Sequence, residues 1–390
     1  MQKPAIEGGD PVRSSFLPFS LPSLGPDEEK EVIDTLRSGW LTTGPKTHRL
    51  ENMFREYFGC KHAVCVNSCT AALHLSLVAL GIKEADEVIT SPITWPATAN
   101  VILHVGARPV FADVEADTLN IEPERIEEKI TKKTKAIIPV HMAGQPCDME
   151  KIYKIARKHK LYIIEDAAHA IGASYMDKKI GTLSDLTCFS FYPIKNITTI
   201  EGGLVTTANA AWEEKIRIYS LHGVSKEAWK RYDKSFKGHA EVLYPGFKYN
   251  MSDVQAAIGL HQLPKLDTFI KQRERIARQY DNAFRTISEI RLPKQIPHIK
   301  HAWHLYIIIL ELEKLKVSRD NFVEAMKREN IGTGIHFRSL HIQPYYKNKF
   351  SFKEKDFPNA FYLSGRILSL PLYPKMNQCD IDTVIKAVKK

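Results

Sequence analysis

Tyr162-Ile163-Ile164-Glu165-Asp166-Ala167-Ala168-His169 combines an apolar run with an acidic end. This pattern is typical of a buried parallel strand that brings Asp166 to its carboxyl end. Ligands of α/β proteins bind beside that end of the strands. A carboxylate there could keep a heterocyclic ring nitrogen protonated, although Asp166 could instead cap the segment that follows it.

Four more apolar, β-rich runs precede this strand, at His62–Val66, Glu87–Thr90, Pro109–Asp113 and Ala136–Val140. Helical stretches separate the runs, which indicates an α/β fold with a doubly wound sheet between helices. A Pro-, Ser- and Gly-rich arm over Pro11–Pro26 and a helix over Asp27–Ser38 come before the first strand. We expect residues 1–251 to form this arm and a large α/β domain.

A long helical pattern runs from Ser252 toward Ile287 and predicts a bridge to a smaller domain. We expect this C-terminal domain, residues 252–390, to be α+β. It would contain the run Trp303–Leu312, a helix over Arg319–Asn330 and a C-terminal helix.

A second informative stretch is Phe189-Ser190-Phe191-Tyr192-Pro193-Ile194-Lys195-Asn196, followed by Glu201-Gly202-Gly203. A lysine attacks a carbonyl only when deprotonated, and partial burial favours that state by lowering its pKa. Lys195 follows an apolar and aromatic run, and the Gly-Gly pair would let backbone pass close to a flat ligand. Any one of 55 Lys and Arg residues is by default a surface charge. Lys195 together with Asp166, however, indicates pyridoxal phosphate chemistry.

Small polar residues stand in Asn67-Ser68-Cys69-Thr70-Ala71-Ala72-Leu73-His74, where a helix is expected to begin after the strand His62–Val66. Free N–H groups and the helix dipole favour an anion at such a start, and the Ser68 and Thr70 hydroxyls could add contacts. Ordinary N-capping explains the pattern equally well until a second phosphate ligand, Ser190, is placed beside it.

Trp95 lies in the turn Ser91-Pro92-Ile93-Thr94-Trp95-Pro96-Ala97-Thr98. Its ring could stack on a cofactor or simply pack in the core.

The order of these parts resembles the DegT/DnrJ/EryC1/StrS family of sugar aminotransferases, which have the fold type I architecture of aspartate aminotransferase. Six separated matches carry the resemblance over nearly the whole chain: Ser38–Pro45, Asn67–Leu73, Glu165–Gly172, Ser190–Gly203, Lys248–Asp253 and Gly332–Arg338. The expected fold is therefore a large domain with a mixed, mainly parallel sheet and a smaller C-terminal α+β domain.

The resemblance implies pyridoxal 5'-phosphate as cofactor and assigns residues to it. Lys195 would bind the cofactor covalently and carry the proton, Asp166 would pair with the pyridine nitrogen, and His169 would lie near the phenolic oxygen. The other expected cofactor contacts are Cys69, Thr70 and Ser190 at the phosphate, Trp95 on the ring, and Asn250 at the phosphate of a neighbouring subunit. The last contact implies a homodimer. Cys69 departs from the glycine or alanine of many relatives, a change that backbone binding of the phosphate should tolerate.

Further pieces of the chain look most like the UDP-4-amino-4-deoxy-L-arabinose–oxoglutarate aminotransferases: Trp303-His304, Gly334–Arg338 and Ser369–Leu372. This likeness implies a UDP-linked 4-keto sugar as amino acceptor and L-glutamate, released as 2-oxoglutarate, as donor. Thr43, His336 and Arg338 are candidate substrate contacts, since Arg suits bidentate binding of phosphate or carboxylate. His336 and Arg338 could equally be surface residues.

The composition agrees with a globular enzyme, at 44% hydrophobic and 26% charged residues. No apolar run is long enough to span a bilayer and Met1-Gln2-Lys3-Pro4 does not begin a signal peptide, so we expect a cytoplasmic protein. The six cysteines are scattered, which predicts neither a metal site nor a disulfide framework.

The net charge of +10 suits an anionic substrate but also raises nucleic acid as a partner. We expect no nucleic-acid binding, because clusters such as Lys226–Lys237 and Lys347–Lys355 also contain acids and no recognised binding module is present. G-x-G-x-x-G and P-loop motifs are absent as well. Two rival functions stay open: a sugar dehydratase of the same family, whose members replace the lysine with histidine, and a non-catalytic sugar-nucleotide sensor.

Overall fold

The computed structural model describes residues 3–225 and 241–390, and the basic cluster Lys226–Lys237 lies outside them. A seven-stranded sheet forms the centre of the large domain, with strand order β1-β9-β8-β5-β4-β2-β3. Its strands are β1 (His62–Val66), β2 (Glu87–Thr90), β3 (Arg108–Phe111), β4 (Thr134–Ile138), β5 (Tyr162–Asp166), β8 (Leu186–Ser190) and β9 (Gly203–Thr207).

The sheet is mixed and mainly parallel, as expected. Neighbouring strands from β3 to β8 pair in parallel, whereas β9 is antiparallel to both β8 and β1. The five predicted strands are confirmed, with shifts of one or two residues at β3 and β4. The sequence did not reveal β8 and β9, which flank the segment that contains Lys195.

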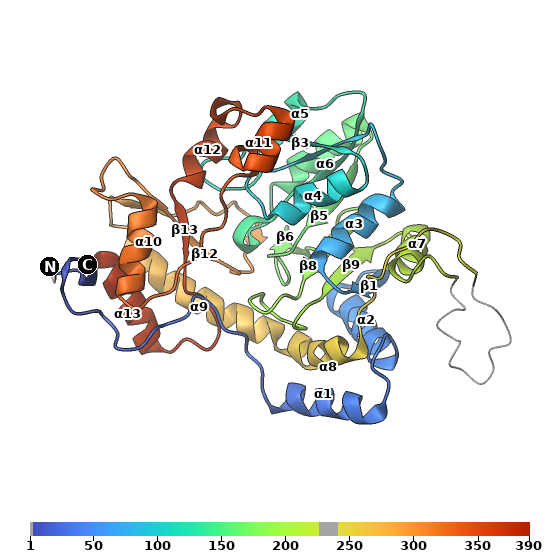
Figure 1. Ribbon diagram of the computed structural model, residues 1–390, viewed down its shortest axis with the longest axis horizontal. Coiled ribbons are helices and arrows are strands. Elements are labelled where there is room, and N and C mark those ends of the chain that lie inside the picture. Colours follow the sequence, from blue (N-terminus) through green and yellow to red (C-terminus); the bar gives the residue numbers. More distant parts are fainter. Residues whose placement is uncertain (1–2, 226–240) are drawn as a thin grey trace.

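Helices cover both faces of the sheet. Successive residues of a strand point to opposite faces, so its apolar side chains pack against helices on both sides. Ile89 and Ile163 belong to one hydrophobic cluster, and their neighbours Val88 and Ile164 belong to another. The large-domain helices are α2 (Pro45–Phe58), α3 (Cys69–Ala79), α4 (Pro96–His104), α5 (Pro123–Glu128), α6 (Met149–His159) and α7 (Ala210–Ser220). The layered α/β architecture therefore matches the expectation (Figure 1).

A nearly continuous helical segment links the two domains (Figure 1). It consists of α8 (Asp253–Gln262), a short 3-10 turn and α9 (Leu266–Phe284), and it confirms the predicted bridge. The Ser252 hydroxyl accepts the backbone N–H of Gln255 and so caps the start of α8. The bridge packs against α1 (Pro26–Ser38) on the large-domain side.

The smaller domain is built on a three-stranded antiparallel sheet of order β10-β12-β13. Its elements are β10 (Ile290–Arg291), β12 (Tyr306–Leu310), α10 (Arg319–Arg328), α11 (Pro344–Phe350), α12 (Pro358–Ser364), β13 (Ile367–Leu370) and α13 (Gln378–Lys389). A third small sheet joins β11 (Ile299–Lys300) to β6 (Ser174–Tyr175) and β7 (Lys178–Lys179).

The N-terminal arm lies against the smaller domain, although it precedes the large domain in sequence (Figure 1). Leu17 bridges to Ile331, and the Glu329 carboxylate accepts the backbone N–H groups of Ala5 and Val12. The division at residue 251 stays a prediction. Over the described ranges, no helix combines the length and apolarity needed to cross a membrane.

Candidate active site

A cavity of about 430 Å³ opens where several strands of the large sheet end. Asp166 closes β5 and Ser190 closes β8, while Thr94 and Trp95 follow β2. The wall on the other side comes from the smaller domain, through His304 and His336. The position agrees with the general preference of α/β proteins for ligand sites at the carboxyl ends of strands.

Lys195 lies in this cavity, in the loop between β8 and β9. Burial of the amine lowers its pKa from 10.5 to about 8, against the opposing influence of Cys69 and Asp166. A lysine with this pKa has a substantial neutral fraction near physiological pH, so Nζ can act as a nucleophile and proton carrier. This is the property expected of Lys195 from its sequence surroundings.

Asp166 is held in place by two hydrogen bonds. The Thr98 hydroxyl donates to Oδ2 at 2.8 Å, and the Ala168 backbone N–H donates to Oδ1 at 3.2 Å. Burial raises the pKa of Asp166, while Thr98, Ala168 and the charge of Lys195 act in the opposite direction. A cationic ligand nitrogen beside this carboxylate would add a favourable charge pair and hold it ionised.

The neighbouring Glu165 faces the other side of β5. It forms a buried 2.7 Å contact with the ring nitrogen Nε2 of His141. It accepts the Thr187 hydroxyl as well.

The start of α3 forms another part of the cavity. Ser68 caps the helix by accepting the Ala71 N–H at 3.1 Å, so its hydroxyl is already engaged. The N–H groups of Cys69 and Thr70 lie in the first turn, where no intrahelical carbonyl is available to them. A Cβ at Gly203 would stand 2.4 Å from the Ser68 carbonyl carbon, which shows how closely β9 passes this turn.

The Cys69 thiol faces the same cavity and is buried. Burial, reinforced by the nearby Asp166, raises the pKa of Cys69 well above its usual value despite the opposing charge of Lys195.

Three histidines lie around the space in front of Lys195, namely His169, His304 and His336. The rings of His169 and His304 are 4.5 Å apart between centroids. The Nδ1 atom of His336 is 2.9 Å from the Ser369 hydroxyl. Burial lowers the pKa of all three, and the charge of Lys195 acts in the same direction. The imidazoles are therefore neutral at physiological pH.

Most of the predicted site residues come together in this cavity: Cys69, Thr70, Trp95, Asp166, His169, Ser190, Lys195 and His336. Thr43 and Asn250 line a second cavity instead, of about 390 Å³. Arg338 is exposed and contributes to neither lining. The roles assigned to all eleven predicted site residues stay predictions. Eight of them share the cavity of Lys195, and Thr43, Asn250 and Arg338 lie outside it.

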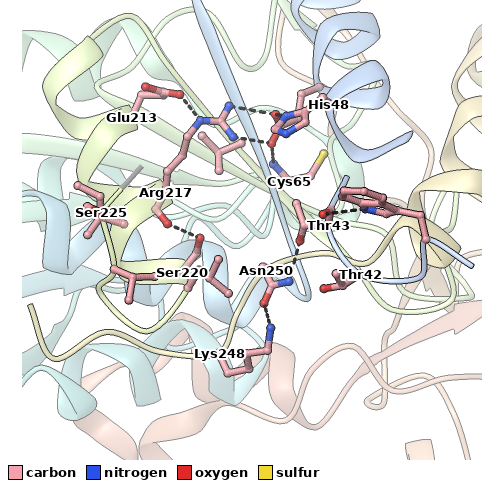
Figure 2. A pocket seen from close by; sticks show the side chains of 16 residues that line it. Thr42, Thr43, His48, Cys65, Glu213, Arg217, Ser220, Ser225, Lys248 and Asn250 are labelled. Carbon is pink, nitrogen blue, oxygen red and sulfur yellow. Dashed lines mark hydrogen bonds and ion pairs between the residues drawn. The ribbon is translucent and has the colours of Figure 1, made fainter. Parts of the chain in front are cut away.

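Figure 2 shows the second cavity, where side chains bind one another. The Asn250 amide donates to the Thr43 hydroxyl at 2.7 Å, and the Lys248 ammonium donates to the Asn250 oxygen at 2.5 Å. Deeper in the wall, two guanidinium nitrogens of Arg217 each lie 3.0 Å from an oxygen of the buried Glu51. These pairs hold the side chains of the cavity wall in place. They also set the orientation of the Asn250 amide, with its oxygen toward Lys248 and its NH2 group toward Thr43.

From the sequence, no role was assigned to Thr98 and His304, two polar residues of the first cavity. Thr98 binds Asp166, and its position three residues after Trp95, in the first turn of α4, is the only hint of that role. His304 stands between apolar neighbours, where a histidine would ordinarily be assigned to the core. Its cavity position depends on the smaller domain folding back toward the large sheet.

The cavity fits pyridoxal phosphate on several independent features. Lys195 offers an activated amine, Asp166 a buried carboxylate for a ring nitrogen, and the first turn of α3 unpaired N–H groups for a phosphate. Trp95 is 63% exposed at the cavity edge, a large apolar ring without full burial. An aromatic side chain in that situation suits stacking on a flat ligand.

Comparison with known proteins agrees with this chemistry. A model of the DegT/DnrJ/EryC1/StrS aminotransferase family matches residues 22–389. An uncharacterized protein of Methanocaldococcus jannaschii is 54% identical over 379 residues, which are 97% of this chain and 98% of the relative. The spore coat polysaccharide biosynthesis protein SpsC of Bacillus subtilis is 51% identical over 378 residues, 97% of each chain.

Solved structures give the same result. Spr1654 of Streptococcus pneumoniae, described as a sugar aminotransferase, was solved in a PLP form that has a TM-score of 0.89 and 34% identity. The match covers 96% of this chain and 98% of that one. PseC of Helicobacter pylori, an aminotransferase involved in the biosynthesis of pseudoaminic acid, has a TM-score of 0.89, 30% identity and the same coverage. Fold, site and comparisons agree that this chain belongs to the DegT/DnrJ/EryC1/StrS aminotransferase family, a PLP-dependent family of sugar aminotransferases.

Proposed function

We propose that this enzyme transfers the amino group of L-glutamate to the keto carbon of a nucleotide-linked sugar. By resemblance, the nucleotide is UDP and the carbon is C4, and the product serves amino-sugar or cell-surface polysaccharide biosynthesis. The observation that carries the proposal is the cavity that joins Lys195, with its pKa lowered to about 8, to the buried Asp166. The name of the Bacillus relative supports a polysaccharide pathway.

Bound pyridoxal phosphate supplies a carbonyl that takes up the amino group and a ring that accepts the electron pair released at the substrate carbon. Lys195 would hold the cofactor through Nζ and, once released, carry a proton on that atom to and from the substrate carbon. Asp166 would keep the ring nitrogen protonated, with Thr98 orienting its carboxylate. The N–H groups of Cys69 and Thr70 would bind the phosphate together with Ser190.

The same residues would serve both half-reactions, because donor and acceptor occupy the cavity in turn. L-Glutamate would leave as 2-oxoglutarate before the keto sugar enters, which is a ping-pong sequence. His169 would lie near the phenolic oxygen, and His336 on the smaller domain would face the substrate.

We also propose a homodimer in which Asn250 completes the phosphate site of the partner subunit. Asn250 and Thr43 line a cavity apart from Lys195, so a contribution to the site in their own chain is not supported by their placement. A cytoplasmic location is part of the same proposal. The described cysteines are all free thiols, as in a reducing compartment.

The first test is to load the purified enzyme with pyridoxal phosphate and follow the visible absorption band of the lysine-bound cofactor. L-Glutamate should bleach the band of the wild type, and a keto-sugar acceptor should restore it. Lys195→Ala should lower turnover by more than about 10³-fold, because both the covalent attachment and the proton carrier are lost. Lys154→Ala, on the exposed face of α6, is the matched control and should behave as wild type.

The rival functions predict other outcomes. A dehydratase would consume the sugar without taking its amino group from glutamate, and a sensor would bind the nucleotide sugar without any bleaching. Substantial turnover by Lys195→Ala would refute the assignment of this residue.

A further inference from the structure

The segment Ala302–Leu305 is anchored unusually well for a segment without secondary structure. Its backbone N–H groups donate hydrogen bonds to the carbonyls of Ala143 and Gly144, at 2.9 to 3.2 Å. The side-chain amide of Asn196, next to Lys195, donates to the Ala302 carbonyl at 2.7 Å. The backbone that carries His304 is therefore tied both to the large domain and to the loop that contains Lys195.

A buried arginine holds the same segment from the other side. Arg273 of α9 donates from Nη1 to the carbonyls of Trp303 and His304, at 3.3 and 3.1 Å. The packing is tight as well, since a Cβ at Gly144 would stand 2.8 Å from the His169 carbonyl oxygen and 3.2 Å from the His304 nitrogen. The backbone at His304 is thus held by hydrogen bonds from two directions.

The imidazole of His304 contacts the His169 ring but forms no hydrogen bond within the described chain. Its Nδ1 is sealed from the cavity and forms no hydrogen bond, and the same is true of Nδ1 of the neighbouring His169. Only Nε2 of His304 is left to reach the cavity that the residue lines. Nε2 also has no hydrogen-bond partner among the described residues, and buried polar side chains are nearly always hydrogen-bonded. A ligand group in the cavity is the partner that this nitrogen can reach.

The charges around the cavity narrow the choice of that group. Lys195 is the only lysine in the described lining, and no arginine contributes to it. Lys195 must engage the cofactor and the reacting carbon. The amino donor carries a carboxylate directly on that carbon, and the donors that the described lining of one chain leaves for this carboxylate are uncharged N–H and O–H groups.

We propose that His304 binds the α-carboxylate of the amino donor through its Nε2–H. The inference rests on the proposed use of L-glutamate as donor. A bound carboxylate accepting at Nε2 would fix the ring proton on that nitrogen, since the partner of one nitrogen sets the tautomer. His304 is then a donor-binding residue that the smaller domain contributes to the site.

An uncharged donor suits a cavity that must accept two different substrates in turn. An arginine would bind the carboxylate more strongly, but it would be left as a buried, unpaired charge when an uncharged part of the sugar takes the same place. A neutral imidazole leaves no such charge, and its N–H can donate equally to a sugar hydroxyl. Dual substrate use thus explains why a histidine stands here.

The test uses the cofactor-loaded full chain and glutarate, which has both carboxylates of glutamate but no amine. Glutarate binding is measured by calorimetry and by the shift of the visible cofactor band. His304→Phe keeps a flat ring of similar size and removes the N–H, and it should weaken glutarate about 10- to 100-fold, the range for a hydrogen bond to a charged group. His304→Gln, whose amide can place an N–H near Nε2, should recover most of the affinity.

Cofactor affinity should stay within about 3-fold of wild type in both variants, because His304 is assigned to the donor and not to the cofactor. His301→Phe is the matched control. It removes a histidine of the neighbouring segment that accepts the Trp303 N–H at 2.8 Å and lines a different cavity. This control should leave glutarate affinity unchanged, whatever its effect on thermal stability.

Several results would overturn the inference. One is a His304→Phe variant that binds glutarate as tightly as the wild type. Another is an equal loss of glutarate affinity in His304→Phe, His304→Gln and His301→Phe, because that pattern would indicate a structural role. A His304→Phe defect confined to the keto-sugar half-reaction would also contradict the inference. So would a wild-type enzyme whose cofactor band is bleached by glutamate but which does not bind glutarate. Failure of the proposed function is distinct, because glutamate would then leave the wild-type band unchanged.

Discussion

The cavity at Lys195 and the cavity at Asn250 are similar in size but differ in how their polar groups are used. The amine of Lys195 and the imidazoles of His169 and His304 line the first cavity, and none of the three side chains forms a hydrogen bond within the described chain. At Asn250, the polar groups bind one another, from Lys248 to Asn250 to Thr43 (Figure 2). The first cavity therefore has polar groups available for a ligand, whereas most polar groups of the second cavity are already paired with one another.

The largest effect within this comparison is expected from Asp166→Asn, which keeps the shape of the side chain but removes its charge. The donor half-reaction should slow on the order of 10³-fold, because the ring nitrogen would lose the charge that keeps it protonated. Stopped-flow measurement of band bleaching by L-glutamate checks this. Thr98→Val, which removes only the hydrogen bond to Oδ2, should cost far less. Equal rates in wild type and Asp166→Asn would show that Asp166 is only structural.

In the second cavity, Glu51→Ala should lower stability without affecting the chemistry. Glu51 is buried, and besides both Arg217 contacts it accepts the Cys65 N–H at 2.9 Å. Removing one member of such a pair leaves a partly buried cation and should cost about 3 kcal/mol of folding free energy. The midpoint of urea unfolding measures the loss.

The comparison variant is His48→Ala, which removes the 3.4 Å contact of a 44% exposed ring with the Glu51 carboxylate and should change the unfolding midpoint much less than Glu51→Ala. The bleaching rate of folded Glu51→Ala should equal that of wild type. A slower reaction with an unchanged midpoint would mean that the second cavity takes part in catalysis within its own chain.

The smallest effect is expected from Asn250→Ala, but it separates the two cavities most clearly. Cofactor affinity should fall about 10-fold, the loss of one hydrogen bond to a charged group. Mixing Asn250→Ala chains with Lys195→Ala chains should then restore the site that takes Lys195 from one chain and Asn250 from the other. Absence of any recovery in verified mixed dimers would place the action of Asn250 in its own chain.

The sequence predicted the parts of the fold that depend on local pattern. The five strands predicted from apolar, β-rich runs, the bridge over α8 and α9 and the placement of Asp166 at the end of β5 are confirmed. Strands β8 and β9 were not predicted, because a short run buried on both faces cannot be told from a buried helix segment by periodicity.

Features that depend on distant segments meeting were harder to foresee. His304 and Arg338 show this from opposite directions. His304 was part of a family likeness but received no role from the sequence, yet the smaller domain brings it to the cavity. Arg338 was a candidate substrate contact, and it lies exposed outside the cavity lining, so its role stays a prediction. The segment around His336 is irregular, so neither the period of a strand nor that of a helix applies to it. The directions of its side chains therefore cannot be predicted from their spacing in the sequence.

The raised pKa of Cys69 has a consequence for chemical reactivity. A thiolate at the start of α3 would place a negative charge where a phosphate dianion is expected to bind, and burial keeps the sulfur protonated instead. The neutral thiol is also a poor nucleophile, so alkylating and oxidising agents should attack the exposed Cys379 long before Cys69. A cysteine in place of a glycine or alanine can therefore persist in a catalytic cavity without making the enzyme redox-sensitive there.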